Sequence, residues 1–104
     1  MPIEIKYISK TIIRQLFNNS DYPSKIGGGN LISLEICDRE ISKPRAIEIG
    51  EPFGTRFQLI RYFEAGNWVV EVAQYLRPNG TIGASGMQDP KRLRIGDIIY
   101  IIER

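Results

Sequence analysis

The hydrophobic and polar residues of this chain alternate with a period of two over several stretches, which is the pattern of β-strands with one buried face. The alternation covers residues 2–8, returns at 31–37 and runs through most of 56–77. A short apolar run at 97–103 has the length and composition of a further strand. These stretches predict a sheet that takes up most of the chain.

One stretch has a helical period instead. In residues 10–19 the apolar side chains fall on a single helical face: Ile12, Ile13, Leu16 and Phe17. Ser9 stands where an N-cap belongs, because its hydroxyl can accept an unpaired backbone N–H of the first turn. Pro23 then prevents the helix from resuming, so residues 21–30, which contain consecutive glycines, are predicted to form a loop.

Prolines mark two further segments. Pro44 and Pro52 bracket residues 45–50, which we interpret as a short edge strand. Asp89 and Pro90 have the order of an N-cap followed by the first helical residue, and they predict a single helical turn.

A hairpin carries most of the information about the faces of the sheet. Gly66 and Asn67 separate two apolar runs and predict a two-residue turn. With that turn, the core face collects the following residues: Phe57, Leu59, Phe63, Trp68, Val70, Val72 and Leu76. The opposite face is then solvated and holds Tyr62, Tyr75 and Arg77.

Arg61 is an exception on the predicted core face. Its stem can be buried at the margin of the core while the guanidinium reaches water or a carboxylate. It can also serve as a fixed fork for a carboxylate or phosphate in a cleft beside the sheet, assisted by Gln74. The sequence leaves both interpretations open.

Together these elements predict the α+β class: a single antiparallel, strongly twisted sheet of about five or six strands with one N-terminal helix packed on one face. Residues 1–104 are expected to form a single domain, because about 100–150 residues is the usual size of one core. Hydrophobic residues make up 42% of the chain and charged residues 25%, which is ordinary for a globular protein.

Composition excludes several kinds of chemistry. The chain has no histidine and a single cysteine, Cys37. It therefore lacks the residues for Ser–His–Asp or Cys–His nucleophiles, for histidine or thiolate metal sites, and for CxxC redox chemistry. We expect no metal and no cofactor, and any catalysis would rest on Lys, Arg, Tyr, Asp or Glu.

Location and partners are only partly constrained. No signal-like segment opens the chain, and its apolar runs are far shorter than the ~20 residues that span a bilayer. We therefore expect a cytoplasmic protein with no membrane partner. The net charge of +2 weakly favours a nucleic-acid partner.

Glycines and cations are combined in residues 77–93, which read RPNGTIGASGMQDPKRL. Residues 78–80 predict a three-residue hairpin loop, with Leu76 opposite Ile82. Residues 84–88 have no evident structural role and lead into a basic stretch: Lys91, Arg92 and Arg94. Either a phosphate contact or an ordinary solvated connection fits this arrangement.

Part of this segment, RPNGTIGASG…DPK, resembles a C-terminal segment of small uncharacterised bacterial proteins that is typically written RPDGTIGASG-x-PDPK. The resemblance covers residues 77–91, with Asn79 in place of an Asp and Gln88 in place of a Pro. It implies kinship and carries no established activity, cofactor or catalytic residue.

The leading hypothesis is a small soluble binding module. It would present the Tyr/Arg face of the sheet and the basic segment 84–94 to a protein or nucleic-acid partner, because Tyr and Arg most often anchor interfaces. The candidate binding residues are Tyr62, Tyr75, Arg77, Ser85, Lys91, Arg92 and Arg94.

Two alternatives remain. Small basic ribonucleases of the toxin–antitoxin type resemble this chain in size, charge and layout, and some of them work without histidine. The candidate catalytic residues would then be Arg61, Arg77, Lys91, Arg92 and Tyr100. The other alternative is a homodimeric structural protein that pairs through an edge strand, either residues 45–50 or residues 97–103.

Overall fold

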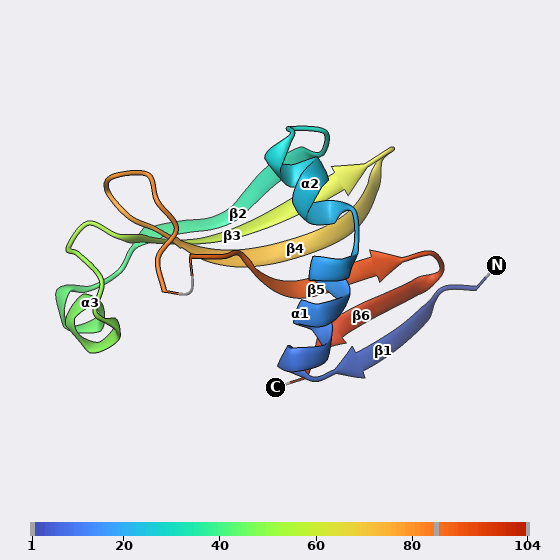
Figure 1. Cartoon of the computed structure of the whole chain (residues 1–104), viewed down its shortest axis with the longest axis horizontal. Coiled ribbons are helices and arrows are strands. Elements are labelled where there is room, and N and C mark those ends of the chain that lie inside the picture. The colour runs from blue at the N-terminus through green and yellow to red at the C-terminus, as the bar shows by residue number, and fades with distance from the viewer. Residues whose placement is uncertain (1, 85, 104) are drawn as a thin grey trace.

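The computed structural model describes residues 2–84 and 86–103. In those residues three helices and six strands form an α+β structure, as predicted. The elements are, in chain order, β1 (Glu4–Ile8), α1 (Lys10–Asn19), α2 (Tyr22–Gly27), β2 (Ile32–Glu40), α3 (Lys43–Ile49), β3 (Arg56–Glu64), β4 (Asn67–Leu76), β5 (Asp89–Ile95) and β6 (Ile98–Ile102). The molecule is elongated, with extents of 47 × 28 × 22 Å (Figure 1).

These six strands belong to one sheet, in the order β1-β6-β5-β4-β3-β2 (Figure 1). Neighbours are antiparallel except for β1 and β6, which run parallel, so the prediction of a purely antiparallel sheet is wrong at this pair. A short hairpin imposes antiparallel pairing, whereas most of the chain separates β1 from β6 and leaves their relative direction free. Main-chain bonds from Glu4 N to Asp97 O and from Glu103 N to Ile8 O add to this parallel pair.

Helix α1 is the predicted N-terminal helix, and its position is confirmed. The Ser9 hydroxyl accepts a hydrogen bond from the Ile12 N–H at 3.2 Å, as expected of an N-cap. The helix packs on β5 and β6, and Ile13 and Phe17 are buried in the contact. The same hydrophobic core includes several sheet residues: Ile60, Tyr62, Val70, Val72 and Leu93.

Helix α2 occupies residues that we predicted as a loop, so that prediction is wrong. Pro23 lies in its first turn, where a missing N–H costs nothing and a fixed φ favours the helix. The helix lies beside α1 on the same face of the sheet (Figure 1). The Tyr22 hydroxyl donates to the Arg94 carbonyl at 2.6 Å, and Lys25 forms an ion pair with Glu64 at 2.6 Å.

Helix α3 replaces the edge strand that we predicted at residues 45–50. Ser42 caps it by accepting the Arg45 N–H at 3.2 Å, and Pro44 lies in its first turn. Gly50, at a φ of 72°, follows the helix in the left-handed conformation that glycine adopts without strain. A proline gives the same signal at an edge strand and at a helix start, which explains the wrong assignment. The helix lies at the end of the molecule remote from β1 and β6 (Figure 1).

The hairpin between β3 and β4 turns one residue earlier than predicted. Its central residues are Ala65 and Gly66, and Glu64 pairs with Asn67. Both central residues have positive φ, 50° and 79°, which a type I′ hairpin turn requires. The predicted turn at Gly66 and Asn67 is therefore wrong.

A bulge at Val69 turns the other face of β3 toward the core, while Val70 and Val72 of β4 stay in the core as predicted. After a bulge, Tyr62 pairs with Val70 and Arg61 pairs with Glu71. Tyr62 is buried in the core under α1, so the prediction that it lies on a solvated face is wrong. The earlier turn alone moves the pairing by two residues and keeps the faces, whereas the extra residue of the bulge moves it by one and inverts the face of β3. The opposite face instead holds residues that were predicted for the core: Phe57, Leu59, Phe63 and Trp68.

The chain from residue 77 onward is partly as predicted. The hairpin loop at 78–80 is confirmed, because Arg77 N donates to Thr81 O at 2.9 Å and Leu76 forms a bridge with Ile82. The predicted helical turn after it is wrong, since these residues form β5. Pro90 at the start of that strand is compatible with a sheet because few ladder bonds are needed there.

The edge strands of the sheet are β1 and β2. The run 97–103 contributes β6, which lies between β1 and β5, and residues 45–50 are largely helical. Neither segment named for homodimer pairing therefore offers an edge, so the strands chosen for that alternative were wrong.

Candidate functional site

Helices α1 and α2 lie on one face of the sheet, and we call the opposite face the open face (Figure 1). The strand registers place one row of residues across it, one from each strand: Leu34, Arg61, Glu71, Arg92, Ile101 and Tyr7. The neighbouring row, which includes Tyr62, Val70 and Leu93, belongs to the core under α1. Charged residues thus occupy the centre of the open face and apolar residues its margins.

At the centre of the open face, Trp68 lies between two guanidinium groups. The Cζ atom of Arg61 is 4.0 Å from the centroid of the indole ring, and that of Arg92 is 3.7 Å from it. The three residues come from β3, β4 and β5. A guanidinium over an aromatic face gains about 0.5–2 kcal/mol, so the contacts favour one arrangement of all three side chains. We call this arrangement the Arg–Trp–Arg stack.

Glu71 balances part of the charge of the stack. The Nε atom of Arg61 donates to its carboxylate at 2.8 Å, and the Glu71 side chain is 15% exposed. Arg61 is therefore paired with a carboxylate, one of the two roles foreseen for it, but on the open face. Arg92 pairs with Glu71 in the strand register and forms no salt bridge with any residue in 2–84 or 86–103.

The indole N–H of Trp68 is buried and has no hydrogen-bond partner in the part of the chain that the structure describes. An unsatisfied buried donor costs about 1–3 kcal/mol. Well-folded proteins retain such local conflicts mostly at functional positions. This cost is therefore a second reason to regard the stack as a working part of the surface.

A cavity of about 470 Å³ lies beside the stack. Its lining mixes apolar and charged side chains, including Leu59, Trp68, Glu71, Lys91, Arg92 and Ile101. Ligand sites commonly measure about 300–1,000 Å³, so the cavity has room for one large side chain of a partner.

Apolar side chains are exposed at both margins of the open face. On β1 the Tyr7 side chain is 65% exposed, and Ile5 beside it is also exposed. On β2 Leu34 is 52% exposed, and Ile32 is more exposed still. Contiguous exposed apolar surface is typical of interaction sites.

The open face also has an excess of positive charge. Arg39, Arg92 and Arg94 lie on it, and within residues 2–84 and 86–103 none of them forms a salt bridge. Arg39 lies over the Phe57 ring at 5.6 Å, and the Arg94 side chain donates to the Gly96 carbonyl. Their guanidinium groups therefore keep most of their donors for other partners.

Of the residues predicted to bind a partner, Tyr75, Arg92 and Arg94 lie on the open face, and Lys91 lines the cavity beside the stack. Tyr62 does not, since it is buried on the covered face, where its hydroxyl accepts a hydrogen bond from the Gln88 amide at 3.2 Å. Ser85 falls outside the described residues.

Arg77 forms an ion pair with a buried acid, and its side chain is 34% exposed. Its Nε and Nη2 atoms donate to the two oxygens of Glu51 at 2.7 and 3.2 Å. The backbone N–H of Ala84 donates to the same carboxylate at 2.7 Å. Arg77, and after it the Ala84 N–H, hold the pKa of Glu51 below its usual value. We call this arrangement the carboxylate clamp.

The carboxylate clamp gives a structural role to three residues of the segment RPNGTIGASG: Arg77, Gly83 and Ala84. Gly83 leaves room for the Glu51 carboxylate, because a Cβ on residue 83 would lie 2.8 Å from the Oε1 atom. Pro78 packs near Gly54, so the loop also contacts the chain just after Glu51. The segment that resembles the small bacterial proteins therefore has a structural role here.

The candidate nuclease residues fall in different places. Arg61, Arg92 and Lys91 lie around the stack and its cavity. Arg77 lies in the carboxylate clamp, and Tyr100 packs against the buried core. These positions do not form one catalytic group.

The sequence pointed to Arg61 but not to Trp68 or Glu71 as its partners. In the predicted register Glu71 was assigned to the solvated face. The turn at Ala65 and Gly66 alone would place Arg61 opposite Val70, and the bulge at Val69 then brings Glu71 opposite Arg61. Opposite charges directly across two strands are a favourable pair, but the bulge that creates this pair has no local signal in the sequence.

Neither a metal cluster nor a membrane-spanning helix occurs in the part of the chain that the structure describes. No group of three or more His, Cys, Asp or Glu side chains in residues 2–84 and 86–103 could hold a metal ion. In the same part of the chain no helix has the length and apolar character needed to cross a membrane. No protein-family model matches the chain, and no curated protein or solved structure matches it.

Proposed function

We propose that the protein is a binding module whose open face binds a protein partner that combines acidic and apolar side chains. The Arg–Trp–Arg stack is the observation that carries this proposal. Trp and Arg are among the residues most enriched at the positions that dominate interface affinity. In this chain they are held together before a partner arrives, so little side-chain entropy is lost on binding.

The charge of the open face favours an acidic partner. Glu71 forms a salt bridge with Arg61, which leaves Arg39, Arg92 and Arg94 with unused donors. A guanidinium takes a carboxylate through two parallel bonds, a geometry that gives both affinity and orientation. Complementary charge also speeds the encounter of the two molecules.

The margins of the open face favour a protein over a nucleic acid. Ile5, Tyr7 and Leu34 offer exposed apolar surface, which a phosphate backbone cannot use. Two guanidinium groups already lie within 4.0 Å of the centroid of the Trp68 ring, and they compete with a base for stacking on this ring.

The same charges argue against a second copy of the chain on this face. In a twofold dimer the same patch of both copies meets itself. The arginine-rich centres would then face each other, and like charges across an interface cost free energy. The open face therefore fits a different protein better than it fits its own copy.

Selection from a displayed library of random peptides tests the proposal. We expect the enriched peptides to intersperse Asp or Glu with Leu, Ile or aromatic residues. Arg92→Glu should abolish the enrichment, because it reverses a charge at the centre of the open face. Lys43→Glu is the control with the same change of charge, since Lys43 lies in the first turn of α3, where an acidic residue is tolerated.

Fluorescence then measures binding in solution, because Trp68 is the single tryptophan of the chain. An enriched peptide should change its emission saturably in the wild type and in Lys43→Glu, but not in Arg92→Glu. The proposal is wrong if only basic peptides are enriched. It is also wrong if a uridine oligonucleotide changes the emission at a lower concentration than any peptide, or if dilution alone changes it through dissociation of a dimer.

A further inference from the structure

A second cavity lies at the edge of β4, where the sheet has a notch. Strand β5 pairs with β4 only as far as Ala73, and the chain rejoins β4 where Ile82 pairs with Leu76. Between these two pairings Gly83 N donates to Tyr75 O at 2.7 Å, so the notch in the edge of β4 is at Gln74. A cavity of about 390 Å³ occupies this notch.

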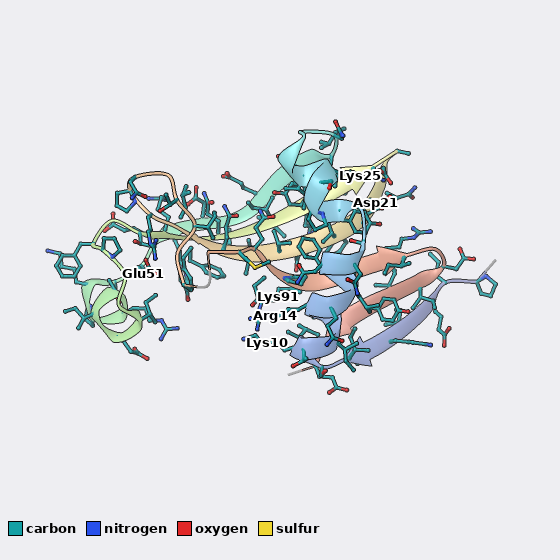
Figure 2. All side chains as sticks on the ribbon, in the orientation of Figure 1. Lys10, Arg14, Asp21, Lys25, Glu51 and Lys91 are labelled. Atoms are coloured by element: carbon teal, nitrogen blue, oxygen red, sulfur yellow. The ribbon has the colours of Figure 1, made fainter. Side chains whose placement is uncertain are left out.

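Three cationic side chains line the cavity: Lys10 and Arg14 from α1 and Lys91 from β5. Lys10 and Arg14 are four residues apart and so lie on the same side of their helix. Figure 2 shows the three side chains beside one another, next to the first turns of α1.

Asp89 holds two of these cations in place. Its Oδ1 atom accepts the Nε of Arg14 at 3.0 Å, and its Oδ2 atom accepts the Nζ of Lys91 at 2.8 Å. Lys10 has no carboxylate partner in residues 2–84 and 86–103. The cavity therefore carries more positive charge than Asp89 neutralises, and two of its cations are fixed in direction.

Apart from Gln74, the remaining lining is apolar or lacks bulk. Phe57, Tyr75 and Met87 contribute side-chain surface, and Gly83 and Ala84 bring the backbone to the cavity without large side chains. A volume of about 390 Å³ is at the lower end of the range for ligand sites, about 300–1,000 Å³. It suits one small molecule better than a length of polymer.

We propose that this cavity binds a phosphomonoester attached to a flat ring, a ligand of the size of a nucleoside monophosphate. The phosphate group contacts Lys10, Arg14 and Lys91, and the ring lies against the apolar lining around Tyr75. A phosphate dianion fits better than a carboxylate, because it offers more acceptor oxygens and more charge to the three donors. The cavity shares Lys91 with the cavity beside the Arg–Trp–Arg stack.

Calorimetric titration with AMP tests the site, with adenosine and inorganic phosphate as the two halves of the ligand. AMP should bind at least about tenfold more tightly than either half, because each half uses only one side of the cavity. Lys10→Gln and Arg14→Gln should each weaken AMP binding by about tenfold, the effect of one lost charge-assisted contact. Lys43→Gln, on the distant helix α3, should bind AMP as the wild type does.

The phosphomonoester could come from a free nucleotide or from the end of a nucleic acid, and short RNAs distinguish the two. A 5′-phosphorylated trinucleotide that binds as tightly as AMP, with a 5′-hydroxyl form that does not bind, assigns the site to a nucleic-acid end. Binding of AMP alone assigns it to a free nucleotide.

The proposal is wrong if AMP does not bind at millimolar concentration while circular dichroism shows a folded protein. It is also wrong if Lys10→Gln binds AMP as tightly as the wild type. Lys10 has no ion-pair partner among the described residues, so its replacement is not expected to disturb the fold. Because no peptide is present in these titrations, their result does not depend on the function proposed for the open face.

Discussion

The carboxylate of Glu51 occupies the space that a side chain at Gly83 would need. A Cβ on residue 83 would lie 2.8 Å from the Oε1 atom and 2.9 Å from the carboxyl carbon. The carboxylate is held there by the guanidinium of Arg77 and the backbone N–H of Ala84. This buried carboxylate therefore favours glycine at residue 83, in the loop after β4.

Gly83→Ala should destabilise the protein by about 1–3 kcal/mol, the usual cost of forcing an extra group into a packed site. For a chain of this size, each kcal/mol lowers the Tm by roughly 4–8 °C. Thermal unfolding followed by circular dichroism measures the change. Gly27→Ala is the matched control, because a Cβ there meets nothing within 4 Å. Equal melting of both variants would show that the loop yields without cost.

The carboxylate clamp should make stability depend on pH. Arg77, and after it the Ala84 N–H, lower the pKa of Glu51 from its ordinary value of 4.5. A carboxyl whose pKa is lower in the folded chain stabilises the fold above the unfolded pKa, and this contribution is lost as the pH falls through the folded pKa. The wild type should therefore be more stable than Glu51→Gln near neutral pH, and the difference should shrink below pH 4.5.

Urea unfolding of both proteins between about pH 7 and about pH 3 measures this difference. Other carboxylates titrate in both proteins alike, so subtraction isolates the contribution of Glu51. A difference that stays constant through the acid range would contradict the assignment of the shift to this residue.

Arg61→Met and Arg92→Met should differ in their effect on stability. Loss of Arg61 leaves Glu71 without its ion-pair partner, and a poorly solvated group left unpaired costs about 1–3 kcal/mol. Loss of Arg92 removes only a contact with Trp68, worth about 0.5–1 kcal/mol at a partly exposed site. Urea unfolding followed by Trp68 fluorescence compares the two. A larger loss for Arg92→Met would mean that the ion pair contributes little.

Local patterns were sufficient to predict part of this fold. The helix that Ser9 caps and the strands around residues 2–8, 31–37 and 97–103 have periodicities that their own residues determine. The hairpin loop at 78–80 follows from its Pro-Asn-Gly sequence for the same reason. The pairing of β1 with β6 lies outside such patterns, because it joins the two ends of the chain.

The register of the β3–β4 hairpin could not be predicted in this way, because both faces of its strands are apolar. Leu59 and Phe63 alternate with Ile60 and Tyr62 along β3. Either face of β3 therefore supplies a plausible hydrophobic set for the core, and the bulge at Val69 selects the face that is buried under α1. The Arg–Trp–Arg stack depends on that register, so the site could not be predicted either.

Two substitutions of Ala65 test the register directly. Ala65 has a φ of 50°, a left-handed conformation that costs a residue with a Cβ about 1–2 kcal/mol. Ala65→Asn creates the Asn-Gly pair that type I′ turns prefer, and should raise the free energy of unfolding by about 0.5–1 kcal/mol. Ala65→Val should lower it, because a β-branched residue tolerates positive φ poorly. If the turn were instead at Gly66 and Asn67, residue 65 would end a strand, where Val is favoured over Asn. The two signs in urea unfolding would then be reversed, and the pairing of Glu64 with Asn67 would be wrong.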